Sequence, residues 1–256
     1  MMKTLRSLEI IDYLKERKYC SMDELMKHFN VSPATIHRDI AALTRKKLIQ
    51  KVHGGAALMP AKDAAATIDS PFSARINKEP GRKTVIAELA QSYIEDGDII
   101  FLDSSTTVLY LSRRIRELSL SNLTIITNSV HIIQEFSLFP PHFVLVGLGG
   151  NYNCQLNSFL GKSAVEGLQW LQIDKAFISA VGATGEGVTT YHENHAEFLE
   201  KAMKLACRKY LLIDSTKFGR TGLFKFAGLQ DFDAIFCDSK PAASLAALCR
   251  RIVSSR

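Results

Sequence analysis

The sequence lacks the features that mark secreted, membrane-spanning or metal-binding proteins. Its five cysteines are an odd, scattered set without a paired metal-binding spacing (Cys20, Cys154, Cys207, Cys237 and Cys249). No apolar run approaches the roughly 20 residues of a membrane helix, and the first residues contain no apolar signal-peptide core. We therefore expect a cytoplasmic protein with reduced thiols, and we expect no metal, no cofactor and no membrane partner.

The charge of the chain is concentrated near its N-terminus. The 256 residues are 46% hydrophobic and 23% charged, which indicates one or two globular domains and excludes a disordered or fibrous protein. Residues 1–56 hold eleven Lys and Arg against six Asp and Glu, a net charge of +5, whereas the whole chain carries +6. A basic end on a nearly neutral body favours nucleic acid binding at that end, although basic helices are often simply solvated.

Three helices are expected in the first 45 residues. Apolar residues recur at helical spacing from Leu5 to Leu14, which predicts a first helix. Ser21 and Glu24 have the spacing of a capping box, which predicts the start of a second helix. Ser32 precedes a proline, and this pair is typical of the first residues of a third helix.

The third helix has the character of a recognition helix. Ile36, Ile40 and Leu43 share one face, which leaves polar side chains on the other faces. A short helix, a tight turn and such a helix form a helix-turn-helix, and residues 48–57 are predicted to form two short strands of a wing. A generic three-helix bundle is the alternative, but spacing, capping and charge all favour DNA binding. The residues expected to contact DNA are Ser32, Thr35, His37, Arg38, Arg45, Lys51 and His53.

The rest of the chain alternates between strands and helices, which predicts a doubly wound, mainly parallel α/β sheet. The expected strands are 99–102, 123–126, 143–146, 175–181, 209–213 and 234–237. The expected helices include 107–118, 132–136 and 198–207, and we expect a further helix to close the chain.

Small polar or glycine turns follow four of these strands, at Asp103–Thr107, Thr127–Ser129, Gly149–Gly150 and Asp214–Lys217. The carboxyl ends of parallel strands share one edge, so the four turns are expected to converge. Their hydroxyls, free N–H groups and one lysine suit a phosphate or another small anion. Helix capping by Ser and Thr is the alternative for any single turn, but four converging turns favour a ligand.

The sequence resembles the DeoR family of bacterial repressors at both ends. The recognition helix motif is matched from Val31 to Ile40, with His37 where Arg is usual, and the wing motif by residues 53–56. The sensor domain of that family, which is related to ribose-phosphate isomerase, is matched by the Asp103 turn, by the Thr127 turn and from Asp214 to Gly219. The first of these turns differs from the family pattern or is shorter by one small residue.

This resemblance implies a winged helix-turn-helix in residues 1–57, a linker in 58–75 and a ribose-phosphate-isomerase-like sensor domain in 76–256. It implies a sequence-specific regulator, a repressor of a carbohydrate operon that a phosphorylated sugar releases. Lys217 is expected to hold the phosphate and Asp103 a sugar hydroxyl. The full expected effector site is Asp103, Ser104, Ser105, Thr106, Thr107, Thr127, Asn128, Ser129, Gly149, Gly150 and Lys217.

Two other functions are possible from the residues alone. One is a sugar-phosphate isomerase with an accessory DNA-binding end, and the other is a structural DNA-binding protein without a ligand. We expect no catalytic residues, because capping and surface charge explain the available carboxylates equally well. The histidines of 192–195 lack the spacing of a zinc-protease helix and are expected to be solvated. DNA reading by paired half-sites predicts a homo-oligomer, a dimer or a tetramer.

Overall fold

The computed structural model describes residues 6, 9–10, 13–14, 17, 19–45, 49–52, 54–58 and 72–255. Their contacts divide the chain into two compact units, 1–69 and 70–256. In the described residues no helix is long and apolar enough to cross a membrane.

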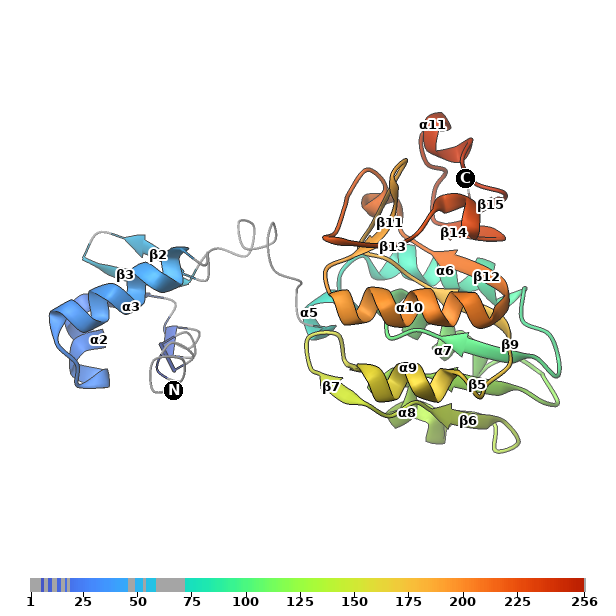
Figure 1. The fold of residues 1–256 in the computed structure, drawn as a ribbon, viewed down its shortest axis with the longest axis horizontal. Helices are drawn as coiled ribbons and strands as arrows, with labels where there is room; N and C mark the ends of the chain where they lie inside the picture. The colour runs from blue at the N-terminus through green and yellow to red at the C-terminus, as the bar shows by residue number, and fades with distance from the viewer. Residues whose placement is uncertain are drawn as a thin grey trace. The chain divides into compact units, whose positions relative to one another are not determined.

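The first unit is a helix-turn-helix followed by a wing (Figure 1). Ser21 begins α2 (Met22–Phe29) with the predicted capping box, and Asn30 turns the chain in a left-handed conformation before α3 (Pro33–Arg45). The predicted wing is confirmed as the antiparallel pair β2 (Ile49–Val52) and β3 (Gly55–Leu58). The structure adds β1 (Tyr19–Ser21), which pairs with β3. Three residues are too few for an alternating pattern, so the sequence did not reveal this strand.

The second unit contains a seven-stranded sheet in which every pair of neighbours is parallel. The predicted doubly wound α/β fold is therefore confirmed. The strand order is β15-β14-β12-β9-β4-β5-β6. The strands are β4 (Ile99–Leu102), β5 (Thr124–Thr127), β6 (Val144–Gly147), β9 (Ile173–Ile178), β12 (Ala206–Leu212), β14 (Ala234–Cys237) and β15 (Ile252–Ser254).

Helices cover both faces of this sheet, and each face has its own core (Figure 1). Successive strand residues point to opposite faces, so Phe101 packs in one core while Ile100 and Leu102 pack in the other. The first core lies under α9 (Lys162–Leu168) and α10 (Glu193–Leu205). The second core lies under α6 (Pro80–Gln91), α7 (Thr106–Ile115) and α8 (Val130–Glu135).

Smaller elements surround the sheet. The chain enters the unit through α5 (Phe72–Ile76), which overlaps the end of the range predicted to be linker, 58–75. Further elements are the hairpin β7 (Asn151–Asn153) and β8 (Ser158–Leu160), a second sheet of β10 (Gly182–Thr184), β11 (Gly187–Thr190) and β13 (Phe224–Ala227), the 3-10 turns η1 (Phe136–Leu138), η2 (Ser215–Lys217) and η3 (Leu229–Asp231), and α11 (Ala243–Ala246).

The expectation that a helix closes the chain is wrong. Helix α11 has only four residues, and β15 follows it at the edge of the large sheet. Ile252 and Val253 pair there with Ile235 and Phe236 of β14. Two adjacent apolar residues that extend a buried parallel sheet give no helical pattern and no alternation, so this strand has no clear sequence signal.

We predict that Gly55→Ala destabilises the first unit. A Cβ atom at Gly55 would lie 2.2 Å from the carbonyl oxygen of Cys20, because β1 and β3 approach closely at this point. Overpacking of this kind costs about 1–3 kcal/mol in the free energy of unfolding, which thermal and urea unfolding followed by circular dichroism will measure. The control is Gly81→Ala in α6, where a Cβ atom meets nothing within 4 Å. An unchanged unfolding midpoint for Gly55→Ala would contradict the pairing of β1 with β3.

Candidate nucleic-acid interface and ligand site

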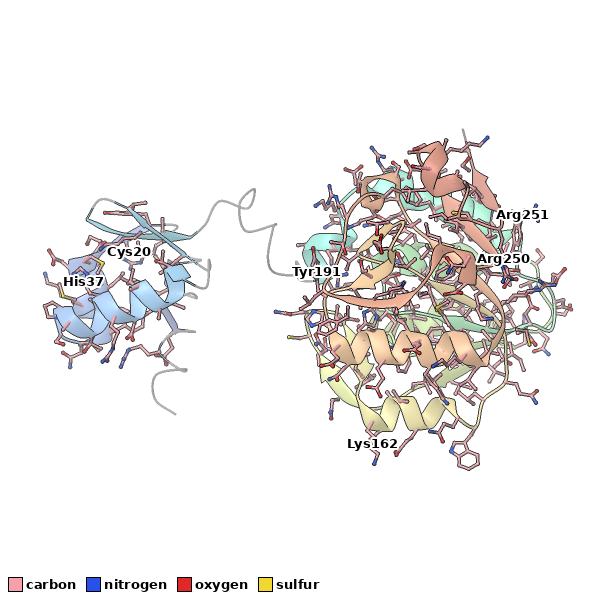
Figure 2. The ribbon with its side chains drawn as sticks, turned by 45° about the horizontal axis from the view of Figure 1, so that its top comes forward. Cys20, His37, Lys162, Tyr191, Arg250 and Arg251 are labelled. Carbon is pink, nitrogen blue, oxygen red and sulfur yellow. The ribbon has the colours of Figure 1, made fainter. Side chains whose placement is uncertain are left out.

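Helix α3 has one buried face and one exposed face. Ile36, Ile40 and Leu43 are nearly inaccessible and pack in the core of the first unit. His37, which Figure 2 labels, and Arg38 are exposed. The side chains of these two residues are therefore available to base edges if α3 enters a major groove.

The other residues expected at DNA lie around this face. The hydroxyl of Ser32, before the first turn of α3, lies 3.0 Å from that of the half-buried Thr35. Lys51 is exposed on β2 of the wing. Arg45 is the last residue of α3, its side chain is outside the described part, and His53 lies outside the described residues.

The predicted convergence of four turns is confirmed at the level of topology. The strands β4, β5, β6 and β12 that precede the turns all belong to the parallel sheet, so their carboxyl ends share one edge. The strand order reverses direction between β4 and β9. In an open α/β sheet such a reversal creates a crevice at the carboxyl edge, where ligands bind.

The side chain of Asp103 links the ends of the two neighbouring strands β4 and β9 through hydrogen bonds. Its Oδ1 accepts the N–H of Ser105 at 2.8 Å, and its Oδ2 accepts the N–H of Ser179 after β9 at 2.8 Å. Complete burial raises the pKa of the carboxyl to about 6, against the effect of these hydrogen bonds. Because both oxygens are engaged, the carboxylate shapes the crevice and is not positioned as the base that an isomerase needs.

The residues after Asp103 have two different roles: one caps a helix, and another has a hydroxyl without a hydrogen-bond partner among the described residues. Ser105 caps α7, since its Oγ accepts the N–H of Val108 at 3.1 Å. Thr106 and Thr107 are the first residues of α7 and are buried. The Oγ atom of Ser104 is buried and has no hydrogen-bond partner among the described residues.

The turn after β5 likewise contains a helix cap and one buried polar atom without a partner among the described residues. The hydroxyl of Thr127 donates to the carbonyl of Leu102 at 2.6 Å, and Ser129 caps α8. The amide nitrogen of Asn128 donates to Ser158 Oγ at 2.8 Å. The Oδ1 atom of Asn128 is buried, and no described residue donates to it.

The two glycines after β6 differ from each other. A Cβ atom at Gly149 would meet nothing within 4 Å. At Gly150, which has a positive φ of 148°, it would lie 2.6 Å from the carbonyl oxygen of Leu160 in β8. Close packing of the β7–β8 hairpin therefore explains Gly150 without a ligand.

Lys217 ends the short turn η2 after β12. The turn is held by Asp238, which accepts the N–H and the hydroxyl of Ser215 at 2.7 and 2.9 Å, and by Arg82, which pairs with Asp238 at 3.0 Å. Within the described residues the Lys217 ammonium forms no hydrogen bond or ion pair, not even with neighbouring Asp214.

Lys217 lies near one carboxylate and three other cations. Burial lowers the pKa of its ammonium; Asp214 opposes this shift, and the charges of Lys78, Arg220 and Arg75 add to it. A half-buried ammonium among other cations is electrostatically unfavourable by itself. An anion at this position would relieve that repulsion.

Arg75 also lies near this edge, close enough for its charge to act on Lys217, and it was not predicted from the sequence. Its guanidinium donates to the carbonyl of Gln155 at 3.0 Å, and buried Lys83 donates to the Arg75 carbonyl at 2.6 Å, so α5 is fastened on two sides. Burial lowers the pKa of this Lys83 to about 8. Arg75 was predicted to be the last residue of the linker. The residues before it have a composition typical of linkers, so the sequence did not indicate that Arg75 belongs to helix α5.

His195 was also overlooked. It was expected to be solvated, but it lies in the first turn of α10 and is 8% exposed. The helical spacing of His195, Leu199 and Ala202 on the buried face of α10 could have revealed this position. No group of three or more His, Cys, Asp or Glu side chains that could hold a metal ion occurs in the part of the chain that the structure describes.

The sequence matches two family descriptions. Residues 6–61 match the "DeoR-like helix-turn-helix domain" and residues 78–239 match the "DeoR C terminal sensor domain". Together they span both units of the structure.

Several curated relatives are similar along nearly the whole chain. One is the HTH-type transcriptional regulator IolR of Bacillus subtilis, 35% identical over 92% of this chain and 90% of the relative. Another is the glycerol-3-phosphate regulon repressor of Escherichia coli, 27% identical over 96% and 94%. A third is the lactose phosphotransferase system repressor of Lactococcus lactis, 31% identical over 94% and 92%. These relatives are transcriptional regulators and not enzymes.

Among solved structures, ribose 5-phosphate isomerase A of Methanocaldococcus jannaschii is similar with a TM-score of 0.37 and 19% identity over 53% of each chain. A likeness this distant carries no argument about the ligand. The two matched domains and the relative that is 35% identical decide the classification. The chain belongs to the DeoR family of DNA-binding transcriptional regulators.

Proposed function

We propose that this regulator is a repressor of a carbohydrate-catabolism operon, and that a phosphorylated sugar releases it from its operator. The observation that carries the proposal is the half-buried ammonium of Lys217, which has no hydrogen bond or ion pair to any described residue. The same edge of the sheet holds Ser104 Oγ and Asn128 Oδ1, which are buried and also lack a partner in the described part of the chain. A buried polar atom without a partner costs about 1–3 kcal/mol. A ligand that supplies the missing partners would recover that free energy.

The chemistry of these groups fits a phosphorylated sugar. An ammonium among cations attracts a phosphate, and the amide oxygen of Asn128 accepts a hydrogen bond from a hydroxyl. The hydroxyl of Ser104 can donate to a sugar oxygen or accept from one. Relatives that are named as repressors of a glycerol-3-phosphate regulon and of a lactose phosphotransferase system support this class of ligand for the present chain.

Release from DNA follows from linkage. A ligand that binds the free protein more tightly than the DNA-bound protein lowers operator affinity by the ratio of its two affinities. Typical couplings of about 1–3 kcal/mol correspond to roughly 5–150-fold. The proposal requires no catalytic turnover.

We predict that Arg38→Ala weakens specific binding much more than non-specific binding. Arg38 lies on the exposed face of α3, and one bidentate base contact supplies about 1–3 kcal/mol of discrimination. Affinities for the operator and for random DNA at fixed salt will measure this. The matched variant is Lys51→Ala, which should weaken both affinities alike as a loss of a phosphate contact. An equal loss in both affinities for Arg38→Ala would make Arg38 a phosphate contact.

We predict that Lys217→Ala leaves a folded protein that binds operator but responds weakly to inducer. The charge-assisted hydrogen bond of Lys217 is worth roughly 1.5–3 kcal/mol, so inducer affinity should fall by one to two powers of ten. The measurement is a thermal-shift screen against ribose 5-phosphate, glucose 6-phosphate and fructose 6-phosphate, followed by titration of the operator complex.

Lys162→Ala is the control for this variant, because Lys162 is an 89% exposed lysine on the surface of α9 whose one ion pair among the described residues is with Glu166. It should keep the wild-type midpoint. If Lys217→Ala also keeps it, Lys217 is not the phosphate ligand. If wild-type protein is stabilised by none of the sugar phosphates, the proposed class of effector is wrong.

We also propose that the protein acts as a homo-oligomer, a dimer or a tetramer, on two half-sites. One helix-turn-helix reads only a short site, and two-fold dimers read half-sites roughly 34 Å apart. Sedimentation of the protein with and without operator tests this. Tight operator binding by a species that sediments only as a monomer would contradict it.

A further inference from the structure

The first turn of α10 lies at the same edge of the sheet as the four turns. Helix α10 runs directly into β12 at Ala206 and packs against β9 and β12, so its N-terminus lies toward the carboxyl ends of those strands. Its 13 residues span about 20 Å, close to the roughly 23 Å of the seven residues of β12. Figure 1 shows α10 beginning at the same end of the unit at which α5 lies, and Figure 2 labels Tyr191 at that end.

The imidazole of His195 is oriented by Thr190. Thr190 is 2% exposed, and its hydroxyl lies 3.1 Å from Nδ1 of His195. This is the single hydrogen-bond contact of that hydroxyl among the described residues. If the hydroxyl donates to Nδ1, the neutral ring carries its proton on Nε2, and only that N–H remains without a partner. The reverse arrangement would leave both the hydroxyl proton and the Nε2 lone pair unmatched. The first arrangement is therefore favoured.

The unmatched group of His195 is thus a neutral donor. Nε2 is buried and has no partner among the described residues. Burial lowers the pKa of the imidazole to about 3, and the charge of Arg75 adds to this shift. The ring stays neutral near pH 7, so it offers a hydrogen bond to an oxygen atom and no charge to a phosphate.

We propose that His195 is an effector-binding residue that donates its Nε2–H to an oxygen of the sugar part of the ligand, while Lys217 holds the phosphate. The inference rests on the proposed function and deepens it, since it requires a ligand larger than a bare phosphate. Consecutive strands lie about 4.8 Å apart, and β12, β9, β4 and β5 are neighbours in that order. The turn of Lys217 is therefore two strand spacings, roughly 10 Å, from that of Ser104.

Each end of the proposed ligand then meets different chemistry. Cations surround Lys217 on the side of β12. Neutral donors and acceptors lie toward β4 and β5, where the open atoms are Ser104 Oγ and Asn128 Oδ1. His195 supplies the buried N–H donor of this neutral part. Such a division selects a polyhydroxylated chain that carries phosphate at one end.

The test compares His195→Asn and His195→Gln in the full-length protein. An Asn amide can reach the position of Nδ1 and keep the contact with Thr190, whereas a Gln amide can reach the position of Nε2. The probes are glucose 6-phosphate, fructose 6-phosphate, ribose 5-phosphate and inorganic phosphate, titrated by calorimetry or competition. Operator affinity without ligand and the unfolding midpoint report whether each variant is folded. The matched control is His142→Asn, at an exposed histidine that contacts the Leu120 carbonyl.

For the sugar phosphate that wild-type protein binds best, His195→Asn should lower affinity about threefold to tenfold, the equivalent of one neutral hydrogen bond. Its affinity for inorganic phosphate should not change, and His195→Gln should restore part of the lost affinity. Lys217→Ala should lower the affinity for both the sugar phosphate and inorganic phosphate. Wild-type sugar-phosphate affinity in a folded His195→Asn, or an equal loss for inorganic phosphate, would overturn the role of His195 while the proposed function stands. If wild-type protein binds none of the sugar phosphates, the proposed function fails and the inference fails with it.

Discussion

The proposed ligand site depends on a buried carboxylate that joins the two central strands of the sheet. Asp103 is completely buried, and its two oxygens accept N–H groups from the residues after β4 and after β9. Burying a charge is costly, as the raised pKa of about 6 indicates. The contacts of Asp103 hold the turn after β4, with Ser104 and the first turn of α7, against the end of β9. A ligand that meets a fixed site loses less free energy to ordering than one that must organise it.

At the carboxyl edge of the sheet, hydrogen bonds and ion pairs hold the turn of Lys217 and the end of α5 in position, but they do not pair the ammonium of Lys217 with a described residue. Asp238 and Arg82 hold the turn of Lys217, yet Lys217 itself has no ion pair among the described residues. Lys83 fastens the end of α5, whose Arg75 adds positive charge to the same region. Lys217 therefore lies among three other cations and one carboxylate, on the same edge as buried neutral donors and acceptors. We infer that this arrangement, more than any single residue, selects a ligand with an anionic end and a hydroxylated body.

The fold could be predicted from the sequence because helix caps, apolar spacing and the order of strands and helices all indicated the same architecture. The structure contains the capping box predicted at Ser21. It also contains the parallel sheet predicted from alternating strands and helices, and this sheet brings the four turns to one edge. The role of each turn residue was not predictable, because Ser and Thr have the same sequence signature as caps and as ligands. Only the hydrogen bonds separate Ser105, a cap, from Ser104, whose hydroxyl has no partner among the described residues. His195 was missed because the helix was expected to begin at residue 198, which left His195 in a loop, whereas α10 begins at Glu193.

In the proposed regulation, the sugar phosphate and the operator favour different states of the same protein, so each ligand weakens the binding of the other. The most direct test of this claim measures two ratios with the same sugar phosphate: operator affinity without and with saturating ligand, and ligand affinity without and with saturating operator. Linkage requires that both ratios have the same value, and a coupling of about 1–3 kcal/mol places that value at roughly 5–150-fold. A sugar phosphate that binds at the edge of the sheet but leaves operator affinity unchanged would contradict the account.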